Sequence, residues 1–227
     1  MSRLRSMWPT VSAEEWGLSA LLVSLTLTLF LGAPLGLLGT AGQYVFDVLF
    51  SLVLISGVIA APRRGALRPF LAALTLVALV FRWTRKGVPT LGTFVWYDVF
   101  AAIAVMVFAL IVLAQVFRSG PITSYRIQGA IVAYLLIGLM WTYGYGMIYE
   151  LVPGAFRFPE GSTTVGPAHG LAYYSFVTLT TVGYGDITPI HPFARSLTMV
   201  EALIGQLYPA VLLARLVSME LASRRRD

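Results

Sequence analysis

The sequence predicts an all-α membrane protein with six transmembrane helices and a shorter re-entrant helix between the last two. Of its 227 residues, 58% are hydrophobic and only 11% are charged. A soluble globular chain carries about 25% charged residues, so this composition excludes an ordinary soluble domain. A helix needs about 20 mostly apolar residues to cross a membrane, and six stretches approach that length. The chain has no Cys and 2 His, which argues against a disulfide framework and a His-based metal cluster.

The six apolar stretches are Trp16–Leu38, Tyr44–Ala61, Pro69–Phe81, Phe94–Phe117, Ile127–Tyr149 and Arg195–Met219. The third is the weakest, because a helix of its uncharged residues would be only about 20 Å long. Its flanking Arg68 and Arg82 would have to extend to the two membrane interfaces. The stretches alone therefore leave open whether the chain crosses the membrane five or six times.

A charged break at Arg118-Ser119-Gly120-Pro121 separates the fourth and fifth stretches. Pro121 suits the first turn of a new helix, because the N–H that proline lacks is not needed there. We therefore divide the chain into a four-helix unit, residues 1–118, and a second unit, residues 119–227. Between the fifth and sixth stretches lies a Gly- and Pro-rich segment, followed by an apolar segment too short to cross a membrane.

The distribution of Lys and Arg favours a cytoplasmic N-terminus. With six spans, 11 of the 16 Lys and Arg residues lie on the N-terminal side of the membrane and 5 on the other. Cytoplasmic loops usually carry such an excess. Omitting the third span changes the counts to 10 and 6, so charge alone does not decide between five and six spans.

The most informative motif is Thr-Val-Gly-Tyr-Gly at Thr181–Gly185, which Asp186 follows. It resembles, without substitution, the selectivity filter of the tetrameric potassium channels. The resemblance covers about residues 119–218 and implies an outer helix, a pore helix containing Tyr173-Tyr174-Ser175-Phe176, the filter and an inner helix. It also implies that both ends of this unit lie in the cytoplasm. With a cytoplasmic N-terminus, an even number of spans must precede the unit, which favours retaining the third helix.

The residue types of this motif suit the binding of a dehydrated cation. Backbone carbonyls can replace the water around an ion when the chain is extended and the carbonyls point inward. Such a backbone alternates in hand, and we expect Gly183 and Gly185 to adopt the positive φ that glycine tolerates. One chain supplies a quarter of each oxygen ring, so a homotetramer is expected. The expected K⁺ ligands are the carbonyl oxygens of Thr181, Val182, Gly183 and Tyr184 and the hydroxyl of Thr181.

Residues expected to support the filter are Tyr173, Tyr174, Thr178, Thr180, Asp186 and Glu201. A carboxyl group inside a membrane helix is costly and needs a partner. Glu201 is expected to brace the pore helix through Tyr173, Tyr174, Ser175 or Thr178, or else to be a protonated residue with a structural role. Some members of the resembled family pair an acidic residue of the pore helix with the filter aspartate. Val177 occupies that place here, which leaves open how Asp186 is held.

The sixth apolar stretch also contains candidate gating positions. Gly205 lies nineteen residues after Asp186, where the resembled channels often carry a hinge glycine; close helix packing is the alternative. Pro209 follows one turn later and weakens the backbone hydrogen bonding. Beyond it, Val211 and Ala214 are expected to approach the cytoplasmic mouth, where apolar side chains can close a pore by dewetting.

A second group of charged residues comprises Asp47, Asp98, Arg82, Arg85 and Lys86. In the six-span topology, all five lie towards the outer ends of the second, third and fourth helices. Charges at this depth tend to pair, so we expect an ion-pair cluster, with separate extension to lipid headgroups as the alternative. The Tyr-Gly-Tyr-Gly sequence at 143–146 lacks the preceding Thr-Val and is expected to serve helix packing.

The fourth apolar stretch lacks the charges of a voltage sensor. In voltage-gated potassium channels this helix carries Arg or Lys at every third position, whereas Phe94–Phe117 carries only Asp98. Voltage acts at about 2.3 kcal/mol per charge per 100 mV, so little coupling is expected. The C-terminal residues are too few for a nucleotide- or calcium-binding domain. Arg224–Arg226 are expected to meet anionic lipid headgroups.

Together with the resemblance, these features predict a potassium-selective channel subunit that conducts K⁺ passively as a homotetramer. The expected location is the plasma membrane, the inner membrane if the protein is bacterial, with both termini cytoplasmic. We expect no enzymatic activity, no organic cofactor and no nucleic-acid partner. The alternative on the same scaffold is a nonselective cation channel, against which Tyr184 and Asp186 argue. A secondary potassium transporter with such loops would carry four in one chain, and a membrane sensor would need no filter.

Overall fold

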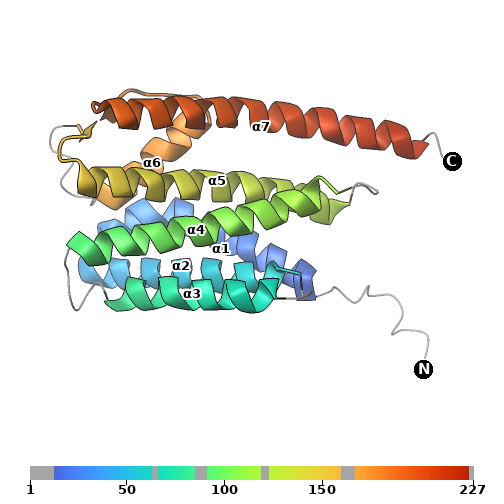
Figure 1. The fold of residues 1–227 in the computed structure, drawn as a ribbon, viewed down its shortest axis with the longest axis horizontal. Coiled ribbons are helices and arrows are strands. Elements are labelled where there is room, and N and C mark those ends of the chain that lie inside the picture. Colours follow the sequence, from blue (N-terminus) through green and yellow to red (C-terminus); the bar gives the residue numbers. More distant parts are fainter. Residues whose placement is uncertain (1–12, 63–65, 85–90, 119–122, 160–166, 225–227) are drawn as a thin grey trace.

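The computed structural model describes residues 13–62, 66–84, 91–118, 123–159 and 167–224. Within these residues the chain forms seven helices and two short strands (Figure 1). In chain order they are α1 (Ala13–Gly36), α2 (Gly39–Ala60), α3 (Leu67–Thr84), α4 (Leu91–Val116), α5 (Ser124–Leu151), β1 (Phe156–Arg157), α6 (Pro167–Leu179), β2 (Thr188–Pro189) and α7 (Pro192–Arg224).

Six helices of the described residues are long and apolar enough to cross a membrane: α1, α2, α3, α4, α5 and α7. The prediction of six spans is therefore confirmed, and the chain is a multi-pass membrane protein. The third span, the weakest in the sequence, is helix α3. It includes Arg68 in its first turn and Arg82 in its last, so these two charged residues extend the helix beyond the uncharged stretch between them.

The long helices lie roughly side by side, with α5 in the middle (Figure 1). Helices α4 and α1 pack against α5 from one side, while α6 and α7 contact it from the other. The shorter helix α6 crosses obliquely between α5 and α7. Helix α1 begins and α7 ends at the same end of the bundle, which is the arrangement that an even number of spans produces.

One buried apolar core joins the four-helix unit to α5. Its members include Leu21 of α1, Phe50 of α2, Leu71 of α3, Phe108 of α4 and Leu136 of α5. Lipid tails are as apolar as these side chains, so close packing rather than removal from water stabilises such a core. The break near Arg118 thus separates two sets of helices along the chain, while α5 packs with both of them.

A second buried cluster lies where α5, α6 and α7 meet the connecting segments; it includes Tyr145, Phe156, Leu171, Tyr174 and Ile187. Strands β1 and β2 pair antiparallel beside it, with Phe156 opposite Pro189. This pairing ties the connection between α5 and α6 to the segment that follows the Thr-Val-Gly-Tyr-Gly motif. Strands of two residues have no periodic pattern, which is why the sequence did not predict them.

Candidate functional site

The Thr181–Gly185 segment follows directly after helix α6 and has a backbone of alternating hand. The φ angles of Thr181, Gly183 and Gly185 are 60°, 58° and 78°, and no other described residue of the segment has a positive φ. Alternation of this kind turns successive carbonyl groups to the same side of an extended chain. The expected positive φ of Gly183 and Gly185 is confirmed.

Thr181 shares this backbone conformation without being a glycine. A residue with a Cβ pays about 1–2 kcal/mol in the left-handed region, and such strain persists only where the surroundings impose it. A 2.9 Å hydrogen bond from the amide of Thr181 to the carbonyl oxygen of Thr178 helps to hold it. The sequence suggested a ligand role for Thr181 but not this strained conformation.

The base of the segment is bonded to the last turn of α6. The carbonyl oxygen of Val177 accepts hydrogen bonds from the amides of Val182, at 3.0 Å, and Gly183, at 3.3 Å. The last carbonyl groups of a helix otherwise lack partners, so the segment acts as the C-terminal cap of α6. The negative end of the helix dipole therefore lies at the base of the segment, where it favours a cation.

The side chains of the segment are not packed inside their own chain. Residues 180–186 are all exposed, and the exposed fraction is 52% for Val182 and 72% for Tyr184. A continuous exposed stretch with an apolar and an aromatic side chain is typical of a surface that another molecule covers.

Asp186, whose support the sequence left open, is bonded to the residue that follows it. Its carboxylate oxygen Oδ1 accepts a 2.9 Å hydrogen bond from the amide of Ile187. Burial and the nearby Asp186 carboxylate raise the pKa of the Tyr173 hydroxyl in α6 to about 12. Tyr173 is therefore a pore-helix residue near Asp186, where Val177 provides no acidic side chain.

Glu201 is fully buried in α7 and joins three helices. Its Oε1 accepts a 2.6 Å hydrogen bond from Ser175 of α6, and its Oε2 accepts one of 2.5 Å from Tyr145 of α5. The Ser175 hydroxyl also lies 2.8 Å from the carbonyl oxygen of Gly138 in α5. Ser175 is one of the partners that the sequence suggested, whereas Tyr145 was missed.

Two further hydrogen bonds fix the position of α6. The hydroxyl groups of Tyr174 in α6 and Thr198 in α7 lie 2.5 Å apart. The hydroxyl of Tyr134 in α5 donates to the carbonyl oxygen of Leu179, the last residue of α6, at 3.0 Å. Helix α6 is therefore held from both sides before the Thr181–Gly185 segment begins.

The two predicted threonines next to this segment lie in different surroundings. Thr178 is buried, and its carbonyl oxygen accepts the Thr181 amide. Thr180, directly after α6, is exposed, and its hydroxyl donates a 2.6 Å hydrogen bond to the carbonyl oxygen of Phe176 in the last turn of α6. Thr178 thus supports the segment through its backbone, while the side chain of Thr180 stabilises the end of α6.

The residues of α5 that the sequence analysis missed share one helix face. Tyr134, Gly138, Trp141 and Tyr145 are spaced by four, three and four residues, which places them above one another on a helix. A Cβ at Gly138 would lie 2.6 Å from the ring of Phe176, so glycine allows α6 to approach α5. This spacing of aromatic residues and a glycine is the sequence pattern that could have predicted which face of α5 contacts α6.

The predicted gating residues lie on α7, which continues as a helix through Pro209. Gly205 is buried against the end of α6, which supports the packing alternative. Val211 lines a cavity between α4, α5 and α7, and its position near a pore mouth stays a prediction. Ala214 is exposed, and its role in a constriction stays a prediction.

The charged residues of the four-helix unit form a buried ion pair. Arg82 Nη2 lies 2.5 Å from Asp47 Oδ1, and both side chains are buried. The guanidinium group also donates a hydrogen bond to the Tyr97 hydroxyl and lies 4.5 Å from the ring centroid of Phe50. The expected pairing is confirmed for these two charges, while Arg85 and Lys86 lie outside the described residues.

The same cluster reaches α5 through the Tyr-Gly-Tyr-Gly sequence at 143–146. The hydroxyl groups of Tyr97 and Tyr143 lie 3.2 Å apart. Asp98 packs against Gly146, where a Cβ would lie 2.8 Å from its Oδ2. The predicted packing role is therefore confirmed at Gly146, whereas a Cβ at Gly144 would meet nothing within 4 Å.

Comparison with known families finds a match in the C-terminal part of the chain. Residues 168–221 match the model of a family described as an ion channel. This range contains nearly all of α6, the Thr181–Gly185 segment and most of α7. The chain therefore carries an ion channel pore domain, and it is not an enzyme.

Similarity to curated proteins falls in parts of the chain. Two pore potassium channel c of Oryza sativa subsp. japonica is 36% identical over 91 residues, 39% of this chain and 17% of the relative. Protein LctB of Geobacillus stearothermophilus is 37% identical over 81 residues, 33% of this chain and 60% of the relative. Protein LctB of Bacillus caldotenax is 49% identical over 45 residues, which are 20% of this chain and 33% of the relative. The chain thus spans less than two thirds of each relative's length. No solved structure matches it significantly.

Proposed function

We propose that the chain is one subunit of a homotetrameric channel that conducts K⁺ passively and selectively across the plasma membrane. The observation that carries the proposal is the alternating φ along Thr181–Gly185. Carbonyl groups aligned by such a backbone replace the hydration shell of an ion. The relative from Oryza sativa is named a potassium channel, which favours K⁺ as the permeant ion.

In this proposal each residue of the segment has a defined role. The carbonyl oxygens of residues 181–184 and the hydroxyl of Thr181 bind the dehydrated ion. Helix α6 directs the negative end of its dipole at the base of the segment, where the cation leaves the wider part of the pore. Tyr173 and Asp186 hold the outer end, and Glu201 holds α6 between α5 and α7.

Assembly of four chains follows from the same geometry. One chain provides one carbonyl group at each level, whereas a closed ring of oxygens needs four, which cyclic symmetry supplies. The exposed Val182 and Tyr184 are then covered by neighbouring subunits. Native mass measurement should give a species near four times 24.7 kDa. A stable monomer or dimer that conducts ions would contradict the proposed assembly.

The orientation and gating parts of the proposal follow from the topology. We place both termini in the cytoplasm, because six spans return the chain to its starting side and the positive charges favour that side. The filter then opens to the outside, and the C-terminal half of α7 surrounds the inner mouth. Helix α4 contains no Arg or Lys, so a change in membrane voltage should act on it only weakly.

The decisive experiment distinguishes a potassium-selective channel from a nonselective one. Purified protein in liposomes is exposed to opposing K⁺ and Na⁺ gradients, and the reversal potential is measured. We expect a reversal potential near that of K⁺. Equal permeability to Na⁺ and K⁺ would reject the proposed selectivity and favour the nonselective channel.

A pair of glycine variants links this measurement to the segment. Gly183→Ala should abolish selective conduction, because a Cβ disfavours the positive φ of 58° at this position. Gly144→Ala is the matched control, since it makes the same chemical change in α5 where a Cβ meets nothing within 4 Å. The control should retain the K⁺ selectivity of the unmodified protein.

A further inference from the structure

Three of the last four carbonyl groups of α6 are bonded to the chain that follows the helix. A helix leaves its last four carbonyl groups without partners of its own. Here the carbonyl oxygens of residues 176–178 accept the backbone amides of residues 180–183 at 2.9 to 3.3 Å. The end of α6 and the base of the Thr181–Gly185 segment therefore form one hydrogen-bonded unit.

The fourth carbonyl group, that of Leu179, is bonded to a different helix. Tyr134 of α5 donates its hydroxyl to this oxygen at 3.0 Å. Leu179 is fully buried, and its carbonyl oxygen packs against Gly205 of α7, where a Cβ would lie 1.9 Å away. The oxygen is thus shielded from water, and a buried carbonyl group that loses its donor is costly. Helix α5 completes the cap on which the segment begins.

The side chain of Tyr134 is itself placed by Tyr208 of α7. The two ring centroids lie 5.4 Å apart, with the ring planes tilted by 32°, which is within the range of favourable aromatic pairs. The Tyr208 hydroxyl donates a 2.7 Å hydrogen bond to the carbonyl oxygen of Ala130 in α5. In an α-helix that oxygen also accepts the amide four residues later, which is the amide of Tyr134. Tyr208 therefore contacts both the ring of Tyr134 and the helical turn that carries it.

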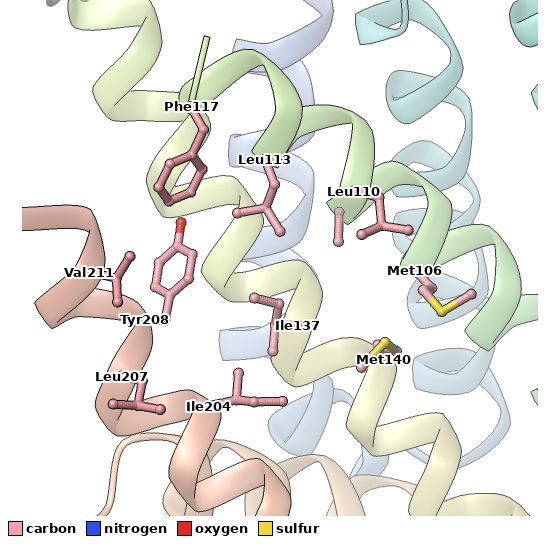
Figure 2. A pocket seen from close by; sticks show the side chains of 11 residues that line it. Met106, Leu110, Leu113, Phe117, Ile137, Met140, Ile204, Leu207, Tyr208 and Val211 are labelled. Atoms are coloured by element: carbon pink, nitrogen blue, oxygen red, sulfur yellow. The ribbon is translucent and has the colours of Figure 1, made fainter. Parts of the chain in front are cut away.

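Tyr208 borders open space on the side that faces α4. An apolar cavity of about 420 Å³ lies between α4, α5 and α7, and Tyr208 lines it together with Leu113 and Phe117 of α4. Figure 2 shows the side chain of Tyr208 extending from α7 beside this cavity. A side chain next to a cavity makes fewer packing contacts on that side. The contacts of Tyr208 with α5 are therefore important for its position.

We propose that Tyr134 is a positioning residue of the filter. Its hydroxyl fixes the Leu179 carbonyl group and, through it, the backbone of the Thr181–Gly185 segment. Tyr208 holds the Tyr134 ring in the orientation that this hydrogen bond requires. This role rests on the proposed function, because the position of the segment matters only if its carbonyl groups bind ions. Both tyrosines act through Leu179, two residues before the first expected K⁺ ligand, and not by contact with the ion.

Hydrogen–deuterium exchange of the purified full-length protein measures this positioning locally. The amides of residues 181–183 donate to carbonyl groups of α6, so their exchange rate reports how often the base of the segment opens. Tyr134→Phe removes the hydroxyl and keeps the ring. Loss of one hydrogen bond of ordinary strength should increase the exchange of these amides about fivefold. The exchange of amides in the rest of α5 should not change.

Tyr149→Phe is the matched control, because it removes the same group from the same helix. The ring of Tyr149 packs against Phe158, and among the described residues its hydroxyl donates to neither α6 nor α7. The control should leave the exchange of residues 181–183 unchanged. Unchanged exchange of these amides in Tyr134→Phe would overturn the proposal. A rise spread evenly along α5, α6 and α7 would also overturn it, because it would mean that Tyr134 supports helix packing in general.

A double variant tests the role of Tyr208. Tyr208→Phe removes the hydrogen bond to Ala130 and should also increase the exchange of residues 181–183. Combining it with Tyr134→Phe should add little to the effect of Tyr134→Phe alone, because the two hydroxyl groups act in series. Effects that add in the double variant would overturn the dependence of Tyr134 on Tyr208.

Reversal potentials in liposomes separate a failure of this positioning role from a failure of the proposed function. Under opposing K⁺ and Na⁺ gradients, Tyr134→Phe should reverse closer to zero than the unmodified protein, whereas Tyr149→Phe should match it. Faster exchange in Tyr134→Phe with an unaltered reversal potential would overturn the link between positioning and selectivity. If the unmodified protein passes both ions equally, the proposed selectivity fails, while the exchange measurement still decides whether Tyr134 positions the segment.

Discussion

Gly205 of α7 touches the last residue of α6: a Cβ at position 205 would lie 1.9 Å from the carbonyl oxygen of Leu179. No side chain fits this distance, so glycine is required for the two helices to meet. The same carbonyl oxygen accepts the hydroxyl of Tyr134. The end of α6, where the Thr181–Gly185 segment begins, is therefore positioned by contacts from α5 and α7 together.

Gly205→Ala should consequently disturb the pore structure rather than only the opening of the channel. Forcing a methyl group into a packed contact costs about 1–3 kcal/mol, and here the displaced group is backbone. We expect a lower melting temperature and loss of K⁺ selectivity in liposomes, with Gly144→Ala unchanged. A folded, fully selective Gly205→Ala protein whose open probability alone has shifted would restore the hinge interpretation.

Pro209→Ala tests bending of α7 without this packing problem. Pro209 is exposed and has no N–H to donate to the carbonyl oxygen of Gly205, four residues earlier. Alanine restores that bond and stiffens the helix. Single-channel recordings in bilayers with and without anionic lipid should show a shifted open probability and unchanged selectivity. An unchanged open probability in both bilayers would place the gate elsewhere, most simply at the filter.

Removal of the Glu201 carboxyl group should destabilise the contact between α5, α6 and α7. Glu201→Ala leaves the buried hydroxyl of Tyr145 without this acceptor, at about 1–3 kcal/mol, whereas the Ser175 hydroxyl keeps the carbonyl oxygen of Gly138 as its acceptor. Glu201→Gln keeps one acceptor oxygen and should be intermediate. The melting temperature of the purified protein measures both effects.

Tyr145→Phe and Tyr149→Phe provide the matched comparison for this network. Both remove one hydroxyl from α5, but only that of Tyr145 bonds Glu201. Tyr145→Phe should lower the melting temperature, whereas Tyr149→Phe should leave it unchanged. Equal effects of the two substitutions would show that the hydrogen bond to Glu201 contributes nothing to stability.

The ion pair between Arg82 and Asp47 should behave as a coupled unit. Breaking a buried pair by removing one partner costs about 3–5 kcal/mol, because the other charge stays buried. Arg82→Gln and Asp47→Asn should each destabilise the protein, and the double variant should be more stable than the sum of the two losses predicts. Additive losses in unfolding experiments would mean that the two side chains do not interact.

Voltage should have little influence on conduction. Helix α4 carries no Arg or Lys, and Arg82 of α3 is held between Asp47, Tyr97 and Phe50. We expect a shallow conductance–voltage curve and no gating current. A steep curve that flattens in Arg82→Gln would contradict this and identify Arg82 as a moving charge.

Much of the architecture was predictable because it depends on regular patterns. Apolar length identified five of the six spans, and the resemblance of the pore unit favoured keeping the short third one. The tolerance of glycine for positive φ predicted the backbone at Gly183 and Gly185. The strain at Thr181 was not predictable, because a hydrogen bond to the preceding turn imposes it. The neighbours of side chains on a membrane span were also not predictable: the sequence did not indicate that Val211 lines a cavity between α4, α5 and α7.

The partners of isolated polar residues were only partly predictable. The position of the Glu201 carboxyl group within a membrane helix predicted a hydrogen-bond donor for it, and Ser175 was among the candidates. Tyr145 was missed because it lies on another helix, and the direction that its side chain faces depends on how α5 packs against α6 and α7. Likewise, the contact of Gly205 with Leu179 depends on how α6 crosses between its neighbours.

Helices α4 and α5 pack along each other within one chain and are joined through residues 117–123. Since the core they share with α1, α2 and α3 needs no second subunit, it can form during synthesis, before the pore segment has left the ribosome. In the proposed homotetramer, biogenesis would then have two stages: each chain completes this helix bundle alone, and subunits recognise one another afterwards through the pore segment. A chain truncated before α6 should still insert into the membrane and fold its helix bundle. It should not assemble with full-length chains, and it should not inactivate them.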